Sequence, residues 1–355
     1  MTQGLLAQQG PNGDFMPPNQ TATEGNDDQA TWALAAMSAA EAQLPASQNT
    51  SWIALAEAVF NEFVVRWDKN GCSGGLRWQI FAFETGYDYK NSISSGAFFQ
   101  LASRLARYTG NSTYSDWATT AYDWTKTIGF IDEDWNVFDG AHVELNCTDI
   151  NKVQFSYTAG TFITGLAHMY NITSGDEKWR SELDGLLNRT LSVFFPGGIA
   201  TEVACEPKET CTIDMMAMKG LLGHWLVDTV QMAPYTSSSV TPLLTSSAEA
   251  AAKACDSTGC SVKWDGTQTG GAEFGGVGGS IDALSFVQGL LMKNAAVAAT
   301  GNSTSTSTST AASGKSTSSS TSGPGAAATN HSGAAVRTGT GLLAVALGSM
   351  LWLIL

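Results

Sequence analysis

The stretch Gly25-Asn26-Asp27-Asp28-Gln29 stands where a polar, Pro-rich lead-in changes to an apolar run from Ala30 to Leu44. Apolar residues recur in that run at helical spacing, so a helix is expected over 29–44. Two adjacent carboxylates therefore lie at a helix start. Neighbouring acids in such a place have a structural interpretation and a chemical one.

The structural interpretation is helix capping. Asn26, with Gln29 three residues later, fits a capping box, and Asp27 and Asp28 are then first-turn acids favoured by the helix dipole. The chemical interpretation is glycoside hydrolysis, in which retaining enzymes use two carboxylates roughly 5 to 5.5 Å apart as nucleophile and acid/base. Like charges so close raise the pKa of one partner, as a proton donor requires. Spacing alone favours capping.

Helical periodicity continues outward from this stretch to about residue 299, with loops rich in Gly, Asn, Ser and Asp between the periodic segments. Helices are expected near 29–44, 51–67, 92–109, 113–129, 154–171, 176–195, 213–233, 237–255 and 279–299. No segment alternates persistently enough to predict a sheet. Residues 1–9 resemble the end of a helix stopped by Gly10 and Pro11.

The helices form pairs that repeat about every 60 residues, which predicts an all-α fold of stacked antiparallel pairs. Such pairs stack as an open solenoid or as a closed toroid of six pairs. Loops between pairs are long and aromatic, as at 78–89 and 135–146, whereas loops within pairs are short. A ligand cleft is therefore expected on the side of the long loops.

Composition bounds the class of protein. The chain has 355 residues, of which 43% are hydrophobic, including 11 Trp and 15 Phe, so a large core is expected. A net charge of −14 argues against nucleic acid as a partner. The four histidines lack metal-ligand spacing, and a lone Asp-Asp pair is far from a calcium loop, so neither a metal nor a cofactor is expected.

Cysteines and sequons indicate a secreted glycoprotein. The six cysteines suggest disulfides in an oxidising compartment, although six buried thiols remain the alternative. Short loops favour pairing Cys205 with Cys211 and Cys255 with Cys260, which leaves Cys72 with Cys147. N-glycosylation sequons begin at Asn19, Asn49, Asn111, Asn146, Asn171, Asn188, Asn302 and Asn330.

The composition changes after residue 300. Half of the residues from Gly301 to Thr340 are Ser or Thr, with no acid and no aromatic, which predicts a disordered, O-glycosylated stalk over 300–340. The apolar run 341–355 is typical of a GPI-attachment signal, with Asn330 or a neighbouring small residue as the attachment site. A short tail-anchor helix is the alternative. The first residues lack a signal peptide.

Several motifs together resemble one family. They are Glu24–Ala30 followed by Trp32, Cys72–Gln79, Tyr89–Asn91 followed by Ser95–Leu101, and Asn146–Lys152. The set is similar to the fungal, GPI-anchored members of glycoside hydrolase family 76, which are mannan endo-1,6-alpha-mannosidases. The resemblance runs over residues 1–299 and implies an (α/α)6 toroid. Because family members carry a signal peptide and further helices upstream, this chain is expected to lack the first two or three helices of the catalytic domain.

The resemblance also implies roles for individual residues. Asp27 matches the catalytic nucleophile and Asp28 the acid/base, with retention of anomeric configuration. Sugar contacts are implied for loop 77–91 and for the start of the helix near 154. The implied substrate-binding residues are Arg77, Trp78, Gln79, Tyr89, Asn91 and Tyr157. Aromatic rings among them pack on the CH faces of sugars. Whether Asp139, Asp149 or Glu202 assists the pair stays open.

The implied activity is cleavage of α-1,6-linked mannose in wall mannan or in GPI-anchor glycan, at the plasma membrane and cell wall after passage through the secretory pathway. Attack on the glycosyl-enzyme by a sugar hydroxyl instead of water would make the protein a transglycosidase, with wall glucan as acceptor. A non-catalytic, wall-anchored glycan-binding glycoprotein is the competing class.

Overall fold

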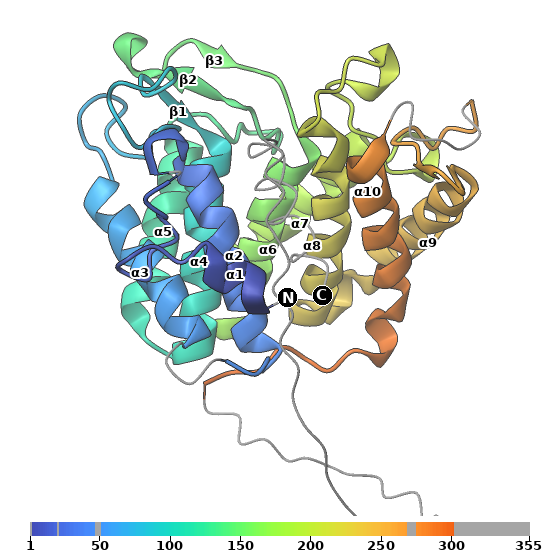
Figure 1. Ribbon diagram of the computed structural model, residues 1–355, viewed down its shortest axis with the longest axis horizontal. Coiled ribbons are helices and arrows are strands. Elements are labelled where there is room, and N and C mark those ends of the chain that lie inside the picture. Colours follow the sequence, from blue (N-terminus) through green and yellow to red (C-terminus); the bar gives the residue numbers. More distant parts are fainter. Residues whose placement is uncertain (1, 20, 47–50, 268–274, 302–355) are drawn as a thin grey trace, which may run out of the picture.

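The computed structural model describes residues 2–19, 21–46, 51–267 and 275–301, and helices dominate this part of the chain (Figure 1). The α-helices are α1 Thr2–Ala7, α2 Asn26–Glu41, α3 Trp52–Arg66, α4 Ser92–Thr109, α5 Ser112–Thr127, α6 Ser156–Ile172, α7 Glu177–Phe194, α8 Met218–Met232, α9 Ser237–Lys253 and α10 Gly276–Gly289. Every helix expected from the periodicity is present. The short α1 also confirms the helix expected before Gly10 and Pro11.

The helices form an inner and an outer set. The even-numbered helices from α2 to α10 pack side by side in series, and each contacts the outer helix that follows or precedes it. Helix α4 is buried from Ser92 to Ala106, whereas α7 buries mainly one face, which includes Leu183, Leu186 and Leu187. One-sided burial is what an amphipathic helix against a core produces. The arrangement confirms the predicted all-α fold of toroid type.

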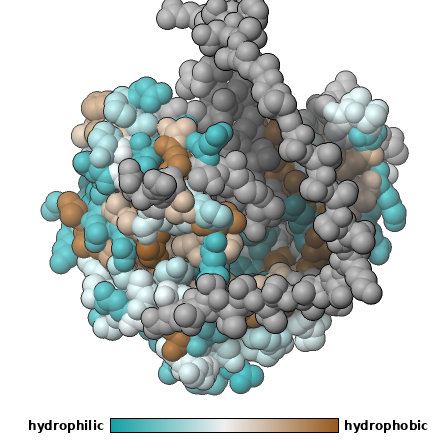
Figure 2. Space-filling model, turned by 60° about the horizontal axis from the view of Figure 1, so that its bottom comes forward, coloured by the Kyte–Doolittle hydropathy of each residue, from teal (hydrophilic) through white to brown (hydrophobic). Residues whose placement is uncertain are grey.

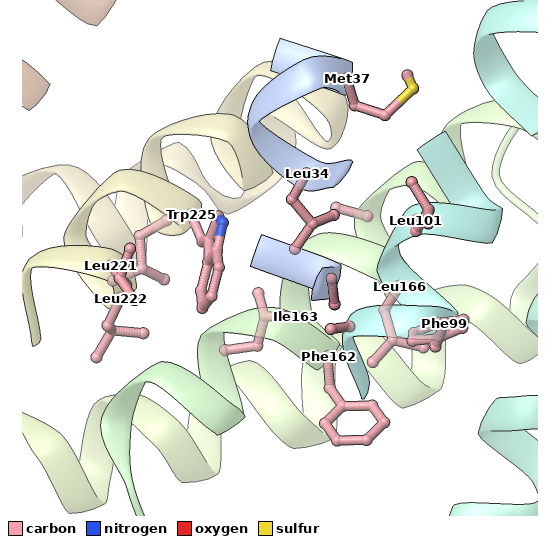
Figure 3. Close-up of a cluster of buried hydrophobic side chains, with 14 of the residues drawn as sticks. Leu34, Met37, Phe99, Leu101, Phe162, Ile163, Leu166, Leu221, Leu222 and Trp225 are labelled. Carbon is pink, nitrogen blue, oxygen red and sulfur yellow. The ribbon is translucent and has the colours of Figure 1, made fainter. Parts of the chain in front are cut away.

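The core lies between the inner helices. Figure 3 shows side chains of four of them, among them Leu34 of α2, Phe99 of α4, Ile163 of α6 and Trp225 of α8, gathered in the space between the helices. Helix α6 approaches α4 closely because Gly165 has no side chain. A Cβ at Gly165 would lie 2.4 Å from the Phe99 ring.

The long loops gather at one end of the molecule. Loops 67–91, 128–155 and 195–217 precede the inner helices α4, α6 and α8, and the described residues 254–267 come before α10, whereas 110–111 and 173–176 join inner to outer helices in a short turn. Antiparallel pairing therefore brings the inner-helix N-termini and the long loops to the same end, at the top of Figure 1. The expected asymmetry of the loops is confirmed.

Two small sheets lie in these loops. Strands β1 Tyr89–Asn91, β2 Gly140–His142 and β3 Ile150–Asn151 form one antiparallel sheet, and β4 Cys255–Asp256 pairs with β5 Gly259–Cys260. The prediction that no sheet forms was therefore wrong. Strands of two or three residues are too short to show the alternation on which a strand prediction depends.

The three expected disulfides are confirmed. Cys72–Cys147 joins the loop before β1 to the loop after β2, Cys205–Cys211 closes a short loop, and Cys255–Cys260 links β4 to β5. The first of these connects residues 75 positions apart. It ties together two of the loops that surround the top end.

The helix predicted over 279–299 was wrong in its second half. Helix α10 ends at Gly289, a 3-10 turn follows at Leu290–Asn294, and the chain then runs toward the ends of α2 and α4. There the Ala299 N–H donates to the Glu41 carbonyl at 2.9 Å, and Arg107 donates to the Ala298 carbonyl at 2.7 Å. These bonds replace those of a continued helix.

The residues from 302 onward lie outside the described part, so the stalk over 300–340, the attachment signal over 341–355 and Asn330 stay predictions. Among the described residues, no helix is both long enough and apolar enough to cross a membrane.

A cavity of about 430 Å³ lies at the bottom end, between the ends of α2, α8 and α10. Its lining includes the ion pair of Arg104 with Glu41, at 2.6 Å, and Asp228, which accepts from His168 at 3.0 Å. Figure 2 turns this end forward, where the described surface is mostly hydrophilic with small hydrophobic areas between. Glu41 ends α2 and Asp27 lies in its first turn, so the cavity is roughly 20 Å from the paired carboxylates.

Candidate active site

The paired carboxylates lie in the first turn of α2. The helix begins at Asn26 with Gly25 as its N-cap, and the Gly25 N–H donates to Oδ2 of Asp28 at 2.9 Å. The capping box was expected between Asn26 and Gln29, which was wrong by one residue. The capping interaction forms between Gly25 and Asp28 instead. One oxygen of Asp28 serves as the cap and leaves the other for chemistry.

Gly25 is a residue that the sequence analysis missed. A Cβ at this position would lie 2.5 Å from Oδ1 of Asp27 and 3.2 Å from Oδ2 of Asp28. Since those two distances limit their separation, Oδ1 of Asp27 and Oδ2 of Asp28 are no more than about 6 Å apart, so the two carboxylates lie close together at the helix start.

Asn26 and Gln29 fasten α2 to its surroundings. Both side-chain carbonyl oxygens accept from the Arg66 guanidinium group at the end of α3, that of Asn26 at 3.0 Å. Asn26 Nδ2 also donates to the Arg77 carbonyl at 2.9 Å. The sequence offered no signal for this role of Arg66, because its only local partner is Glu62, one helical turn earlier.

Glu24 is a third acid near the pair, one residue before the N-cap Gly25. It is buried, its Oε2 has no hydrogen-bond partner among the described residues, and burial together with the charge of Asp28 raises its pKa to about 8. Glu24 is therefore protonated at neutral pH and adds no negative charge to the site there.

The loop after Arg77 lies against the start of α2. The Asn26 N–H donates to the Trp78 carbonyl at 2.9 Å, the Trp78 N–H donates to the Tyr89 carbonyl at 2.7 Å, and Gln79 forms a β-bridge with Gly25. This backbone pairing places the Trp78 indole beside the pair, where Nε1 donates to Oδ2 of Asp27 at 3.1 Å. Of the predicted sugar-binding residues, Trp78 thus contacts Asp27, whereas Gln79 pairs with the backbone of Gly25.

The two carboxylates have perturbed pKa values. Burial, and next the charge of Asp28, raise the pKa of Asp27 well above its usual range, while the Trp78 N–H opposes the rise. Burial also raises the pKa of Asp28, the Gly25 N–H opposes it, and the charge of Asp214 adds to it. Because the two groups interact, they titrate as a pair, and one proton stays on the pair to a higher pH than on an isolated aspartate.

Two of the predicted sugar-binding residues, Arg77 and Asn91, have structural roles: Arg77 stabilises the loop that follows it, and Asn91 caps α4. The Arg77 guanidinium pairs with Asp68 at 2.7 Å, donates to the Tyr87 carbonyl at 2.8 Å and lies 4.4 Å from the centre of the Tyr87 ring. The Asn91 side chain is the N-cap of α4, where it accepts from the Ser94 N–H at 3.1 Å. Neither contacts Asp27 or Asp28.

Tyr89 and Tyr157 are both linked to a further acid, Asp139. The Tyr89 hydroxyl donates to Oδ2 of Asp139 at 2.7 Å, and Asn151 Nδ2 donates to the same oxygen at 3.1 Å. Tyr157 lies in the first turn of α6, and burial followed by the charges of Asp27 and Asp139 raises its pKa. The fold therefore brings Asp139, left open by the sequence, to the same end as the pair.

The other two open acids differ in place: Glu202 lies near Tyr157, whose pKa its charge helps to raise, whereas Asp149 lies at the surface. Glu202 is buried at the start of α6, where it accepts from the N–H and the hydroxyl of Ser156, and burial raises its pKa to about 7. It serves as a cap of α6. Asp149 is exposed in the loop between β2 and β3.

No group of three or more His, Cys, Asp or Glu side chains that could hold a metal ion occurs in the described ranges. The predicted sequons at Asn19, Asn111, Asn146, Asn171 and Asn188 are exposed, and Asn49 lies outside those ranges. Glycan attachment at these positions stays a prediction.

Comparison with known proteins identifies a family match and close relatives. The model for glycosyl hydrolase family 76 matches residues 1–302. The chain is 46% identical over 305 residues to putative mannan endo-1,6-alpha-mannosidase C970.02 of Schizosaccharomyces pombe, covering 84% of this chain and 69% of that protein. It is 42% identical over 296 residues to mannan endo-1,6-alpha-mannosidase DFG5 of Saccharomyces cerevisiae, covering 81% of this chain and 64% of that protein.

Two solved structures illustrate the structural likeness. The crystal structure of Dfg5 from Chaetomium thermophilum in complex with glucosamine matches with a TM-score of 0.81 and 42% identity, over 84% of this chain and 76% of that one. The GH76A alpha-1,6-mannanase from Salegentibacter sp. HEL1_6 matches with a TM-score of 0.64 and 16% identity, over 82% and 88% of the two chains. The second likeness concerns the fold alone.

Proposed function

Because the chain belongs to glycosyl hydrolase family 76, we propose that it cleaves α-1,6-mannosidic bonds within mannan, with Asp27 and Asp28 as the catalytic pair. The observation that supports this most directly is the narrow space beside Gly25, which both carboxylates border. Carboxylates this close are compatible with the roughly 5 to 5.5 Å at which retaining glycosidases hold their nucleophile and acid/base. The geometry favours retention.

In this mechanism Asp27 attacks the anomeric carbon while Asp28 donates its proton to the glycosidic oxygen. The bond to the leaving sugar breaks, and a glycosyl ester forms on Asp27. Water then attacks the same carbon, Asp28 accepts its proton, and Asp27 leaves as a carboxylate. Trp78 donates to Asp27, and Tyr157 is near enough for the charge of Asp27 to raise its pKa, so both are candidates to contact the reacting sugar.

The proton of the pair must move when substrate binds. The buried Oδ1 of Asp27 has no hydrogen-bond partner among the described residues, and burial raises the pKa of this carboxyl group; both favour the protonated form of Asp27. Asp28 accepts the Gly25 N–H at a helix N-terminus, which favours its charged form. An attacking carboxylate is ionised, so the proton passes from Asp27 to Asp28 before attack, and the Trp78 N–H stabilises the charge left on Asp27.

Single substitutions of the pair test the proposal. Asp27→Asn and Asp28→Asn should each lower turnover of α-1,6-linked mannooligosaccharides by roughly 10²- to 10⁴-fold, the usual contribution of acid–base groups or more. Affinity for the same oligosaccharides should persist. The exposed acid in the variant Asp149→Asn is the matched control and should leave turnover unchanged. Full activity in either Asp27→Asn or Asp28→Asn overturns the assignment of these residues as the catalytic pair. A protein that only binds glycan would be indifferent to both substitutions.

Azide separates the two roles. With an activated mannosyl substrate, Asp28→Ala should form a mannosyl azide of retained configuration, because azide attacks the ester on Asp27 from the water side. Asp27→Ala should form the inverted azide, because azide then enters in place of the missing carboxylate. The reverse pattern assigns the roles in the opposite order.

We also propose transfer as a second activity, in which a sugar hydroxyl replaces water in the second step. The glucosamine in the related Dfg5 structure favours it, since that relative accommodates a sugar other than mannose. GPI-anchor mannose as donor and wall glucan as acceptor fit this reaction. Incubation with a mannooligosaccharide and a glucan oligosaccharide should yield a mixed product by mass spectrometry, and free mannooligosaccharides alone would exclude transfer.

We propose that the protein acts at the cell surface, held by a GPI lipid. The three disulfides and the exposed sequons support passage through the secretory pathway. Release of the native protein from membranes by phosphatidylinositol-specific phospholipase C is the expected result. Retention after that treatment would contradict the lipid anchor.

A further inference from the structure

The loop from Trp78 to Asp88 exposes aromatic rings to solvent. Trp78 is 38% exposed and Phe83 is 72% exposed, whereas the other exposed aromatic among the described residues, Tyr235, donates its hydroxyl to Asp184. Phe81, which is half-buried, lies parallel to Phe83 with ring centres 5.4 Å apart and 13° between the planes. Two phenyl rings and an indole thus share one loop of the top end.

The backbone of this loop is held by its own hydrogen bonds. Successive turns join the Glu84 N–H to the Phe81 carbonyl at 3.0 Å and the Tyr87 N–H to the Glu84 carbonyl at 3.1 Å. The Trp78 ring packs on Gly86, which has a φ of +97° and where a Cβ would lie 2.4 Å from the ring. The rings are therefore presented in a set arrangement, which lowers the entropy lost on binding.

The exposed rings continue from the catalytic pair. Trp78 donates to Asp27, and Gln79 forms the β-bridge with Gly25. Phe81 follows Gln79 by two residues, so the two Cα atoms are at most about 7 Å apart. The loop therefore carries Phe81 and Phe83 onward from the residue that pairs with the start of α2.

We propose that Phe81 and Phe83 form a stacking platform for hexose units of the glycan chain beyond the sugar that reacts. The proposal rests on the proposed function, since it takes the substrate to be a chain of hexoses. The CH faces of pyranose rings are flat and apolar and pack on aromatic faces, while the carboxylate of Glu84, the residue after Phe83, can accept from sugar hydroxyls. The loop from Trp78 to Asp88 contains no Lys or Arg, which disfavours an anionic lipid surface as the occupant.

The double variant Phe81→Ala/Phe83→Ala tests the platform. The kcat/KM for a long α-1,6-mannooligosaccharide should fall about threefold to tenfold, the range of an aromatic stacking contact, while the value for the shortest substrate that is cleaved should stay unchanged. Val65→Ala is the control, because Val65 is 85% exposed on α3 and is not part of the loop from Trp78 to Asp88. It should affect neither substrate. The melting temperature of each variant shows whether the fold is kept.

The outcomes separate the platform from the proposed function. If the wild type cleaves α-1,6-mannosides and the double variant loses nothing, or loses equally on short and long substrates, the platform is wrong and the activity stands. If the wild type cleaves none of them, the proposed function is wrong. Calorimetric titration of the same oligosaccharides then decides, because equal affinity of wild type and double variant refutes the platform. One further result would refute the platform. The wild type would bind phosphatidylcholine vesicles, the double variant would not, and neither protein would depend on the length of the oligosaccharide.

Discussion

Replacing Trp78 by Phe tests how the site controls Asp27. The change deletes the indole N–H that donates to Oδ2 of Asp27 at 3.1 Å and keeps an aromatic ring over Gly86. A hydrogen bond to a charged group contributes about 1.5 to 3 kcal/mol. Trp78 is 38% exposed, so the lower end applies, which corresponds to roughly one pKa unit.

The sign of the effect follows from which form the donor favours. The N–H stabilises the carboxylate, so its removal raises the pKa of Asp27. The acidic limb of the pH profile of kcat should therefore move upward by about one unit in Trp78→Phe, and turnover on that limb should fall about tenfold. The assay measures kcat from low to neutral pH. The substrate is a short α-1,6-mannooligosaccharide, because its cleavage does not depend on contacts between the protein and distant sugar units.

Trp135→Phe is the matched control. Trp135 Nε1 donates to Glu182 on the outer helix α7, also at 3.1 Å, so this variant removes the same kind of bond away from the carboxylate pair. Its pH profile should equal that of the wild type. An unshifted limb in Trp78→Phe, or an equal shift in Trp135→Phe, would refute the reasoning that the indole tunes the nucleophile.

Three other substitutions test the site and its support. Gly25→Ala should abolish turnover, because the new Cβ would lie 2.5 Å from Oδ1 of Asp27. The fold should stay intact, because the φ of −85° at this position suits alanine. Gly165→Ala is the control: its Cβ would lie 2.4 Å from a ring in the core, so it should lower stability and keep kcat. Glu202→Gln should remove a pH dependence of about 3 kcal/mol in the free energy of unfolding. Burial raises the pKa of Glu202 from 4.5 to about 7, so its contribution is complete below pH 4.5 and is lost as pH rises through 7; denaturant unfolding at the two ends of this range measures it, and an equal slope in the variant contradicts it. Lys90→Met should cost about 3 kcal/mol or more in the same assay, because buried Nζ donates to the carbonyls of residues 68, 71 and 74 at 2.7, 3.0 and 2.6 Å; a stability equal to the wild type would show that the loop does not need it.

The site combines a helix end with a loop that no local pattern connects to it. The sequence places Asp27 and Asp28 at a helix start, and it places Trp78 and Gln79 in a long aromatic loop. Their meeting depends on the bond from Asn26 to the Trp78 carbonyl, across 52 positions of the chain. The family resemblance supplied that association, and periodicity alone would not have done so.

The sequence by itself determined the helix pairs, the loop asymmetry and the disulfides. Helical periodicity is a local property, repeated in each segment, and short cysteine separations leave few pairings open. The helices and the two short disulfide loops are confirmed because they depend on neighbours along the chain, whereas the pairing of Cys72 with Cys147, 75 positions apart, followed once the other four cysteines were paired.

The tertiary structure alone decided what each polar side chain does. Asn26 holds Arg66 instead of capping α2, Asn91 caps α4 instead of reaching the pair, and Asp139 joins the site through Tyr89. The same amide or carboxylate can cap, pair or bind, and the choice depends on which donors the folded chain brings within about 3 Å. That distance is set by the packing of whole helices and loops, which no stretch of sequence specifies locally.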